Sequence, residues 1–273
     1  MILKLGFMQG RLINSEKKNT IQYFPSKNWS KEFKIARKIN LRIMEWTINN
    51  ENLKDNPLYN GDLKKLRKII KKYKIKVPSI TNDFFMQKPF FKKKNKDKKN
   101  IIINNLKKII LNANKLGIKY HIYPLVDNGS IKNLEEEKIL IHEIEKLSSV
   151  LNKNSWILFE TDYNPNKVIK FLKKFKNKKI GINYDTGNSA NLNYNFADEI
   201  KYFSYVKNIH LKDRLSNGGT VRLGKGNWNY KKFFKLIKKV YKGNFILQTA
   251  RSLKNKHIDE ILINKKFIEN EYK

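Results

Sequence analysis

Ile180-Gly-Ile-Asn-Tyr-Asp-Thr-Gly-Asn188 decides the fold, because it joins a buried strand to a terminal carboxylate and a glycine turn. Alternate side chains of a strand share a face, so Ile182 and Tyr184 lie on an apolar face. Asn183 and Asp185 lie on the opposite face, which is small and polar. A carboxylate at the C-terminal end of a strand, next to a glycine turn, is typical of a site on a parallel barrel.

The same design recurs on both sides of this stretch. Trp156-Ile-Leu-Phe-Glu160, Tyr205-Val-Lys-Asn-Ile-His210 and Phe245-Ile-Leu-Gln248 are apolar runs that each end in a polar side chain. Glu160, Asp185 and His210 are evenly spaced, at the length of one strand–helix unit. The longer interval before Gln248 leaves room for a long, glycine-rich loop over residues 212–228.

Strands and helices alternate along the whole sequence in eight units with no linker between them. The predicted strands are 2–7, 41–46, 77–81, 118–123, 156–160, 180–185, 205–210 and 244–249. The predicted helices are 30–39, 63–73, 101–116, 134–151, 165–175, 196–203, 230–240 and 257–268. This alternation predicts a single α/β domain over residues 1–273, closed as a (β/α)₈ TIM barrel, which typically takes ~250 residues. A Rossmann fold is disfavoured because no Gly-x-Gly-x-x-Gly follows the first strand.

Composition excludes several classes of protein. The chain has 273 residues, 40% of them hydrophobic, and no cysteine. Disulfides, thiolate zinc sites and a cysteine nucleophile are therefore excluded, and we expect a cytoplasmic protein. The first eight residues are too short and polar for a signal peptide, and no apolar run approaches the ~18 residues that span a membrane.

The charge is extreme, with 59 Lys and Arg against 24 Asp and Glu, a formal net charge of +35. One interpretation is a polyanionic partner such as nucleic acid. The other is compositional drift, since Lys, Asn and Ile are abundant in every segment and few aromatics lie within the lysine runs. We favour drift, and we predict neither a specific nucleic-acid partner nor a membrane partner.

Side chains at the C-terminal ends of barrel strands converge, so Glu160, Asp185 and His210 should meet there. Two carboxylates and an imidazole suit one divalent ion, Mn²⁺, Mg²⁺, Co²⁺ or Zn²⁺. Gln248 adds an amide oxygen as a fourth ligand or a substrate contact. The alternative is that these are ordinary turn caps and core residues. Their recurrence at successive strand ends favours the metal site.

The chain resembles the xylose isomerase-like barrels, the superfamily of sugar and sugar-phosphate isomerases and epimerases that also holds endonuclease IV. The strongest stretches of this resemblance are Phe159-Glu160, Asp185-Thr-Gly-Asn188, His210-Leu-Lys-Asp213 and Leu223-Gly-Lys-Gly226. Met8-Gln-Gly-Arg11, Gln22-Tyr-Phe-Pro25, Glu45-Trp46 and Asp83-Phe-Phe-Met86 look like a subgroup associated with bacterial surface-sugar synthesis.

The resemblance implies a metal held at Glu160, Asp185, His210 and a strand-eight Glu, with the two Glu positions moving a proton on opposite faces of an enediolate. Two residues depart from the pattern. Gln248 replaces the strand-eight Glu, and this replacement puts epimerisation by two bases in doubt. Asn188 stands where endonuclease IV-like members place a zinc-binding His, which argues against a three-metal nuclease.

We therefore predict a metal-dependent sugar or sugar-phosphate isomerase or epimerase, with Glu160 as metal ligand and base. Glu45, at the end of strand two, is a candidate second acid/base or an ordinary turn carboxylate. The alternatives are a non-catalytic sugar-binding barrel and an endonuclease. A homo-oligomer is left open.

A phosphate on the substrate would meet the loops after strands seven and eight, where TIM barrels often bind phosphate. We predict substrate contacts from Arg222 and Arg251, and from Lys212 in the same loops. The glycines at 224 and 226 would let backbone N–H groups approach the anion.

Overall fold

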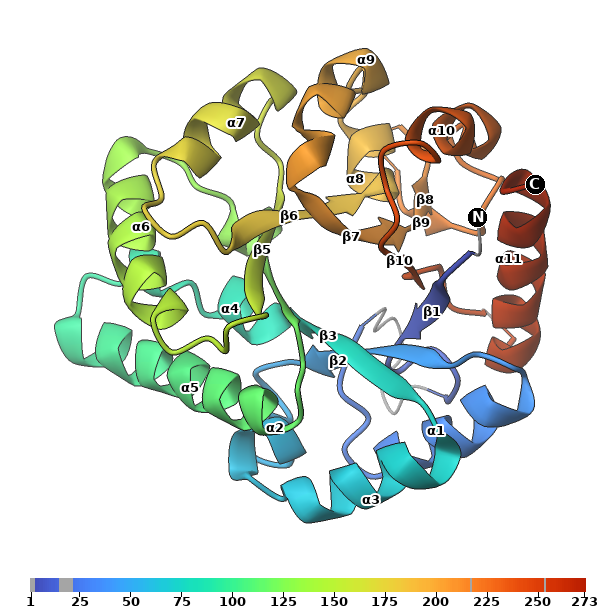
Figure 1. Cartoon of the computed structure of the whole chain (residues 1–273), viewed down its shortest axis with the longest axis horizontal. Helices are drawn as coiled ribbons and strands as arrows, with labels where there is room; N and C mark the ends of the chain where they lie inside the picture. The colour runs from blue at the N-terminus through green and yellow to red at the C-terminus, as the bar shows by residue number, and fades with distance from the viewer. Residues whose placement is uncertain (1–2, 15–21, 217, 253) are drawn as a thin grey trace.

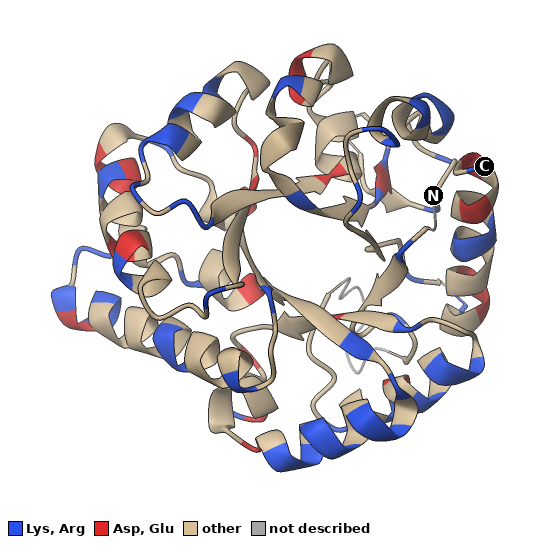
Figure 2. Ribbon diagram, viewed as in Figure 1, with Lys and Arg blue, Asp and Glu red and all other residues tan. Residues whose placement is uncertain are grey.

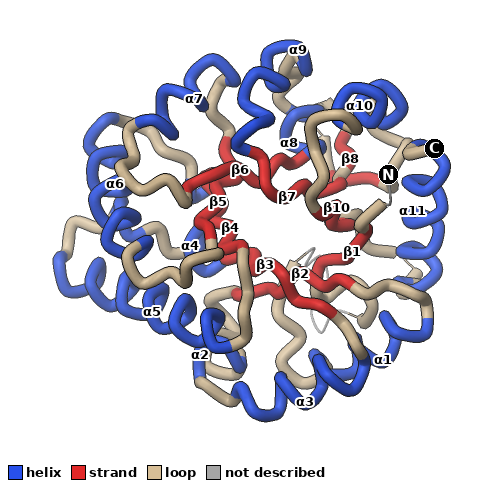
Figure 3. Tube along the Cα trace, in the orientation of Figure 1, coloured by secondary structure: helices blue, strands red, loops and turns tan. Residues whose placement is uncertain are grey.

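The strands carry apolar side chains on one face and small polar ones on the other, a pattern that fits a barrel whose apolar outer face packs on a ring of helices. The computed structural model describes residues 3–14, 22–216, 218–252 and 254–273. Its parallel strands close in the order β1-β10-β7-β6-β5-β4-β3-β2. Figure 1 shows this ring of strands at the centre with helices around it, and Figure 3 shows the same two layers by colour.

The barrel strands are β1 (Leu5–Met8), β2 (Ile43–Ile48), β3 (Lys76–Asn82), β4 (Tyr120–Leu125), β5 (Trp156–Thr161), β6 (Ile180–Asp185), β7 (Val206–Leu211) and β10 (Asn244–Leu247). The α-helices are α1 (Trp29–Lys38), α2 (Pro57–Asn60), α3 (Leu63–Tyr73), α4 (Asp83–Gln87), α5 (Lys96–Lys115), α6 (Leu134–Ser148), α7 (Pro165–Lys173), α8 (Thr186–Asn191), α9 (Phe196–Glu199), α10 (Tyr230–Ile237) and α11 (His257–Glu271). Short 3₁₀ turns cover Phe90–Lys92, Asp127–Gly129 and Ile200–Tyr205, and a two-stranded hairpin joins β8 (Asp213–Arg214) to β9 (Thr220–Val221).

The barrel closes through β1, which pairs in parallel with β10 on one side and with β2 on the other. The two faces of β6 have the different surroundings that the alternation of apolar and polar side chains predicts. Tyr184 packs outward, with ring centroids 5.0 Å from Phe203 and 5.7 Å from Phe233. Asn183 points inward and contacts side chains of β5 and β7. The helix layer therefore takes the apolar face, and the barrel interior receives polar groups.

The predicted fold, a closed (β/α)₈ barrel, is confirmed, but several element predictions were wrong. Residues 82–86, expected to be a loop, belong largely to helix α4, and the short helix α8 was not expected. The loop at 212–228 contains the β8–β9 hairpin. Helix α5 begins at Lys96, before the predicted start, because the Asn95 side chain caps it by accepting from Lys98 N at 2.9 Å. The predicted start of strand one at Ile2 lies outside the described residues.

The predicted end of strand four at residue 123 was wrong, because β4 continues through Pro124 to Leu125. Pairing of β4 with β3 ends at Ile122, whereas pairing with β5 continues through Leu125. A proline lacks one N–H donor, and here that donor is missing beyond the end of the β3 ladder. The strand therefore reaches the top of the barrel with Pro124 beside Glu160.

Basic side chains lie on helices around the whole ring (Figure 2), so the charge is not gathered on one element. Among the residues that the structure describes, no helix has the length and apolar character needed to cross a bilayer.

Candidate metal centre and cavity

Three side chains from neighbouring strands meet at the C-terminal end of the barrel. Glu160 of β5, Asp185 at the end of β6 and His210 of β7 are buried, and each offers a ligand atom within 4.8 Å of the others. Strand register causes this meeting, because Asp185 lies directly opposite His210 in the β6–β7 pairing. The structure thus brings together the three residues at which the sequence predicts a metal.

His210 uses its two ring nitrogens in different directions. Nδ1 lies 3.1 Å from Glu160 Oε2 and 3.9 Å from Asp185 Oδ2, and Nε2 lies 2.6 Å from Glu45 Oε1. Burial lowers the pKa of His210, but the charge of Glu45 and the bonds to both glutamates outweigh it and raise the pKa to about 10. The imidazole of this arrangement therefore carries a proton on each nitrogen at neutral pH.

Glu45 lies behind His210, and the described residues that line the cavity do not include it. It is fully buried and accepts hydrogen bonds from Ser79 at 2.7 Å, from Asn208 at 2.9 Å and from Thr81. Its oxygens are engaged by these donors and by His210. Glu45 therefore lies outside the cavity lining, and its role as a second acid/base stays a prediction.

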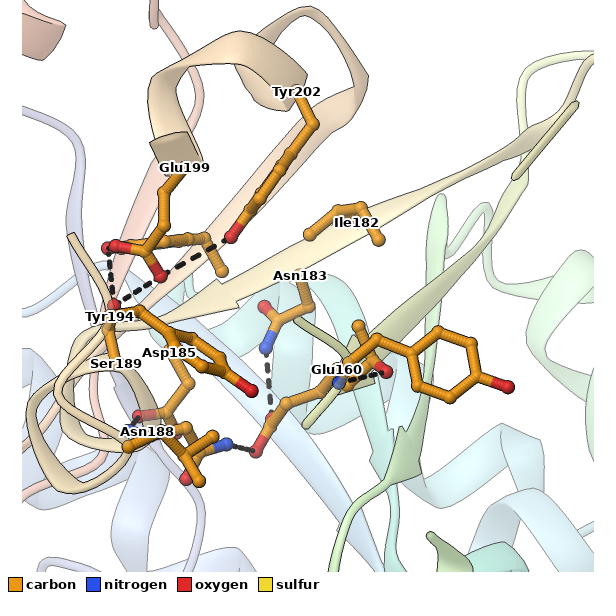
Figure 4. Close-up of a pocket in the computed structure, with 13 residues that line it drawn as sticks. Glu160, Ile182, Asn183, Asp185, Asn188, Ser189, Tyr194, Glu199 and Tyr202 are labelled. Atoms are coloured by element: carbon orange, nitrogen blue, oxygen red, sulfur yellow. Dashed lines mark hydrogen bonds between the residues drawn. The ribbon is translucent and has the colours of Figure 1, made fainter. Parts of the chain in front are cut away.

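Glu160 is held by two amides. Asn183 Nδ2 donates to Oε2 at 3.1 Å, and Asn188 Nδ2 donates to Oε1 at 2.8 Å. Figure 4 shows both amides directed at this carboxylate. Burial opposes ionisation of Glu160, but the hydrogen bond and charge of His210 lower its pKa. Glu160 is consequently an oriented, ionised carboxylate.

The two carboxylate oxygens of Asp185 differ in their contacts. Oδ1 caps helix α8 by accepting from Gly187 N at 2.7 Å and Asn188 N at 2.9 Å. Oδ2 is buried and, among the described residues, receives no hydrogen bond. The nearest charged groups are Lys212 Nζ at 3.6 Å and His210 Nδ1 at 3.9 Å. Burial raises the pKa of Asp185, so a cation at Oδ2 would stabilise its charge.

A polar cavity of about 240 Å³ lies over this group. It is lined by Arg11, Gln22, Thr81, Asp83, Met86, Gln87, Pro124, Val126, Asp127, Glu160, Asn188, Lys212, Arg214, Thr220 and Gln248. At ~30 Å³ per water, this is room for roughly eight waters or one small polar molecule. Gln248 donates to Gln22 Oε1 at 2.9 Å, and its own Oε1 is buried without a hydrogen-bond partner among the described residues.

Four charged residues of the cavity received no role in the sequence analysis, and two of them, Arg11 and Asp83, are buried. Both lie in stretches that carry the resemblance, so the signal was present, but nothing in their spacing shows that they face one cavity. Arg11 Nε donates to Thr249 O at 3.0 Å, and burial lowers its pKa to about 9. Burial raises the pKa of Asp83 to about 7.

Of the three basic residues predicted to contact substrate, Lys212 lines the cavity and the two arginines do not. Arg222 forms a two-pronged ion pair with Glu260, at 2.8 and 2.7 Å. Arg251 donates to the backbone carbonyls of Gly10 and Ile13 and lies over the Tyr23 ring. Other contacts within the protein therefore occupy both guanidinium groups, and the substrate contacts of Arg222 and Arg251 stay predictions.

The glycine-rich loop is also engaged within the protein. The carboxylate of Asp213 accepts from Gly224 N at 2.9 Å and from Gly226 N at 3.0 Å. These backbone N–H groups were expected to approach a substrate anion, but they bind this internal carboxylate instead. The cations that line the cavity are Arg11, Lys212 and Arg214.

The sequence model of the xylose isomerase-like TIM barrel matches residues 33–264. The chain belongs to this family. None of the curated proteins matches the sequence.

Solved structures of the xylose isomerase-like fold superpose on nearly the whole chain at low identity. A D-allulose 3-epimerase from Methylomonas sp. in complex with D-allulose is 13% identical, with a TM-score of 0.78 over 99% of this chain and 97% of that one. An IOLI protein with a bound zinc atom is 16% identical, with a TM-score of 0.75 over 99% and 98%. A Mycobacterium smegmatis protein in complex with magnesium is 14% identical, with a TM-score of 0.70 over 99% and 96%. At these identities the likeness shows the shared fold.

Proposed function

We propose that the protein is a divalent-metal-dependent isomerase or epimerase of a sugar or sugar phosphate. The observation that carries this proposal is the convergence of Glu160, Asp185 and His210 within 4.8 Å under a polar cavity. Two carboxylate oxygens and one imidazole nitrogen are a donor set for hard and borderline divalent ions.

The residues fit a metal ion on three counts. Asp185 Oδ2 is buried without a hydrogen bond, and His210 Nδ1 points at both carboxylates. Glu45 at His210 Nε2 is the carboxylate that commonly orients a metal-binding histidine from behind. When bound, the ion would act as a Lewis acid that stabilises negative charge on a substrate oxygen. The donor set admits Mn²⁺, Mg²⁺, Co²⁺ or Zn²⁺, and Gln248 is a candidate fourth ligand.

Glu160 is the residue we assign as base. Its carboxylate lies on the cavity wall, and the amides of Asn183 and Asn188 fix its orientation. A positioned carboxylate can take the proton from a carbon next to a carbonyl group. Lys212 and Arg11 add positive charge to the same cavity, which favours an electron-rich or anionic substrate.

The solved relatives support the choice of substrate class. One of them is an epimerase of a monosaccharide, held in complex with that sugar. The cavity of about 240 Å³ suits a molecule of this size. A role in surface-polysaccharide sugar metabolism, in the cytoplasm, remains our proposal from the sequence, as does assembly into a homo-oligomer.

Gln248 favours a second candidate, a non-catalytic sugar-binding barrel. An amide at the end of β10 cannot take or give the proton that a strand-eight Glu would move in the family. An endonuclease has less support, because Asn188 donates to Glu160 where a further metal-binding His would be needed.

The test begins with the metal. Purified protein should hold about one divalent ion per chain, and Asp185→Ala should abolish its uptake with the fold intact.

Incubation with ketoses and their phosphates in D₂O should place deuterium on the carbon next to the carbonyl. Equal metal content in the wild type and in Asp185→Ala and His210→Ala would remove the metal site. Metal uptake and sugar binding without deuterium incorporation would favour the sugar-binding barrel, and metal-dependent nicking of abasic DNA would favour the endonuclease.

A further inference from the structure

Asp83, the first residue of α4, lies on the wall of the cavity that also holds Glu160. It follows directly after β3, and it is 5% exposed. A third carboxylate of the wall, Asp127, is exposed. Among the described residues of the cavity, Asp83 is therefore the buried carboxylate besides Glu160.

A chain of hydrogen bonds connects Asp83 to the position of the missing strand-eight carboxylate. Gln248 Nε2 donates to Gln22 Oε1 at 2.9 Å. Gln22 Nε2 then donates to both oxygens of Asp83, at 2.9 and 2.8 Å. Three side chains that are far apart in the sequence thus join the end of β10 to the end of β3 along one cavity wall.

The hydrogen bonds of this chain are consistent with one orientation of the Gln22 amide. Gln22 must turn its nitrogen towards the Asp83 carboxylate, which leaves its oxygen facing residue 248. An amide at 248 supplies the N–H that this oxygen needs, whereas an ionised Glu there would meet it with a second acceptor. Gln248 is therefore the side chain that suits an Asp83 oxygen as the acceptor for Gln22, and the two residues form one arrangement.

We propose that Asp83 is the second acid–base residue of the reaction, paired with Glu160 across a single cavity. This inference rests on the proposed isomerase or epimerase function. Glu160 takes a proton from the substrate carbon, and the electron pair of that C–H bond forms the C=C bond of an enediolate as the carbonyl π pair moves to oxygen. Protonated Asp83 then gives its proton to carbon, and the C=O bond re-forms. Water exchanges the protons of the two carboxyl groups before the next turnover.

The surroundings of Asp83 suit a group that must both give and take a proton. Burial raises its pKa to about 7, near the pH at which a general acid–base group is most effective. The nearby groups act in both directions. Gln22, Arg11 and His210 lower this pKa, and Glu160 raises it.

The test compares proton exchange with product formation, using D-allulose and its 6-phosphate as probes, with Mn²⁺ in D₂O. Without Asp83, Glu160 can still remove the proton and return a deuteron to the same carbon. Asp83→Asn should therefore lower product formation about 100-fold or more, the lower range for a lost general acid, and lower deuterium exchange into the substrate by tenfold at most. Glu160→Gln should lower both.

Two further variants sharpen the comparison. Gln248→Glu in the Asp83→Asn background puts a carboxylate back on the same wall, and it should recover at least tenfold of the lost product formation. Asp62→Asn removes an exposed carboxylate that makes no capping hydrogen bond, and it should leave both rates unchanged.

A spectroscopic readout does not depend on the folding of a variant. In wild type with ¹³C-carboxyl-labelled aspartate, the Asp83 signal should titrate with an apparent pKa about 7, and saturating sugar should shift it. Product formation at the wild-type rate in Asp83→Asn, or an Asp83 signal unmoved by bound sugar, would overturn the role of Asp83 and leave the isomerase function standing. If the wild type exchanges no proton of either sugar, the proposed function fails, and the role of Asp83 fails with it.

Discussion

Glu45 Oε1 lies 2.6 Å from His210 Nε2, on the side of the imidazole ring away from Glu160 and Asp185. Both side chains are fully buried. Once an ion replaces the Nδ1 proton, this contact keeps the remaining proton on Nε2, so the lone pair of Nδ1 faces the ion. The same contact makes Glu45, which lies outside the cavity, a residue that positions the His210 ring.

Glu45→Gln should therefore weaken metal binding by about 10–100-fold, the range for a residue behind a metal ligand. The isosteric amide keeps the packing and removes the negative charge from behind His210. Competition with a chelator of known affinity measures this change. Glu143→Gln, which removes a carboxylate of helix α6, is the matched control, and equal affinity in both variants would show that Glu45 does not support the ligand.

Metal uptake should release a proton from His210. With a pKa raised to about 10 by Glu45 and Glu160, Nδ1 is protonated at neutral pH, and the ion must replace that proton. The apparent metal affinity should then rise about tenfold per pH unit between pH 6 and pH 9. Calorimetry in two buffers with different heats of ionisation counts the protons. Release of none would mean that Nδ1 already lacks a proton at neutral pH, or that His210 does not bind the ion.

Strand period and strand order together made the meeting of Glu160, Asp185 and His210 predictable. Side chains at the ends of consecutive parallel strands have few other places to go once the barrel closes. The roles of the arginines were not predictable in this way. Arg251 follows a strand end as a ligand-binding arginine would, and only the fold shows that the carbonyls of Gly10 and Ile13 hold its guanidinium group.

The polar chain from Gln248 through Gln22 to Asp83 lies beyond sequence reasoning for the same reason. Its bonds join residues more than sixty positions apart through the ends of side chains, where neither helical nor strand period applies. Gln248 alone indicated lost chemistry, whereas its hydrogen-bond chain to Asp83 supports our proposal that Asp83 carries the second acid–base role.

Asp213 joins two stretches that the sequence analysis noted separately. Its carboxylate accepts backbone N–H bonds from Arg214 at 3.0 Å, Gly224 at 2.9 Å, Gly226 at 3.0 Å and Trp228 at 3.2 Å. Asp213→Asn turns an NH₂ group towards some of these donors, so they lose their acceptor. We expect a loss of about 2–4 kcal/mol in the free energy of unfolding, the cost of unsatisfied buried donors.

Denaturant unfolding measures the effect, with Asp198→Asn as the control. Asp198 is partly exposed and pairs with Lys201 within one helical turn, so its loss should change stability by less than about 1 kcal/mol. Since Arg214 and Thr220 of the same loop line the cavity, Asp213→Asn should also weaken sugar binding. An unchanged unfolding free energy would show that the loop does not depend on this carboxylate.

Glu32 of α1 should make the protein less stable as the pH rises. It is fully buried, and it accepts from Gly10 N at 2.9 Å and Leu12 N at 3.0 Å. Burial raises its pKa from 4.5 to about 7, against the lowering effect of these bonds and of Arg251 and Arg11. The folded protein therefore holds this proton more tightly than the unfolded chain does. The stability it contributes is complete below pH 4.5 and is lost as the pH rises through about 7.

Glu32→Gln removes this titration and keeps an acceptor for the two N–H groups. Between pH 5 and pH 8, the unfolding free energy of the wild type should fall relative to that of Glu32→Gln by about 2.5 kcal/mol, at 1.36 kcal/mol per pKa unit. Urea unfolding of both proteins at each pH gives this difference, in which the titrations of Asp83 and Glu199 cancel. Glu269→Gln, at an exposed carboxylate of α11, should show no such trend. A constant difference between wild type and Glu32→Gln across this range would mean that Glu32 is already ionised in the folded protein at pH 5, and that the N–H groups of the β1 loop outweigh its burial.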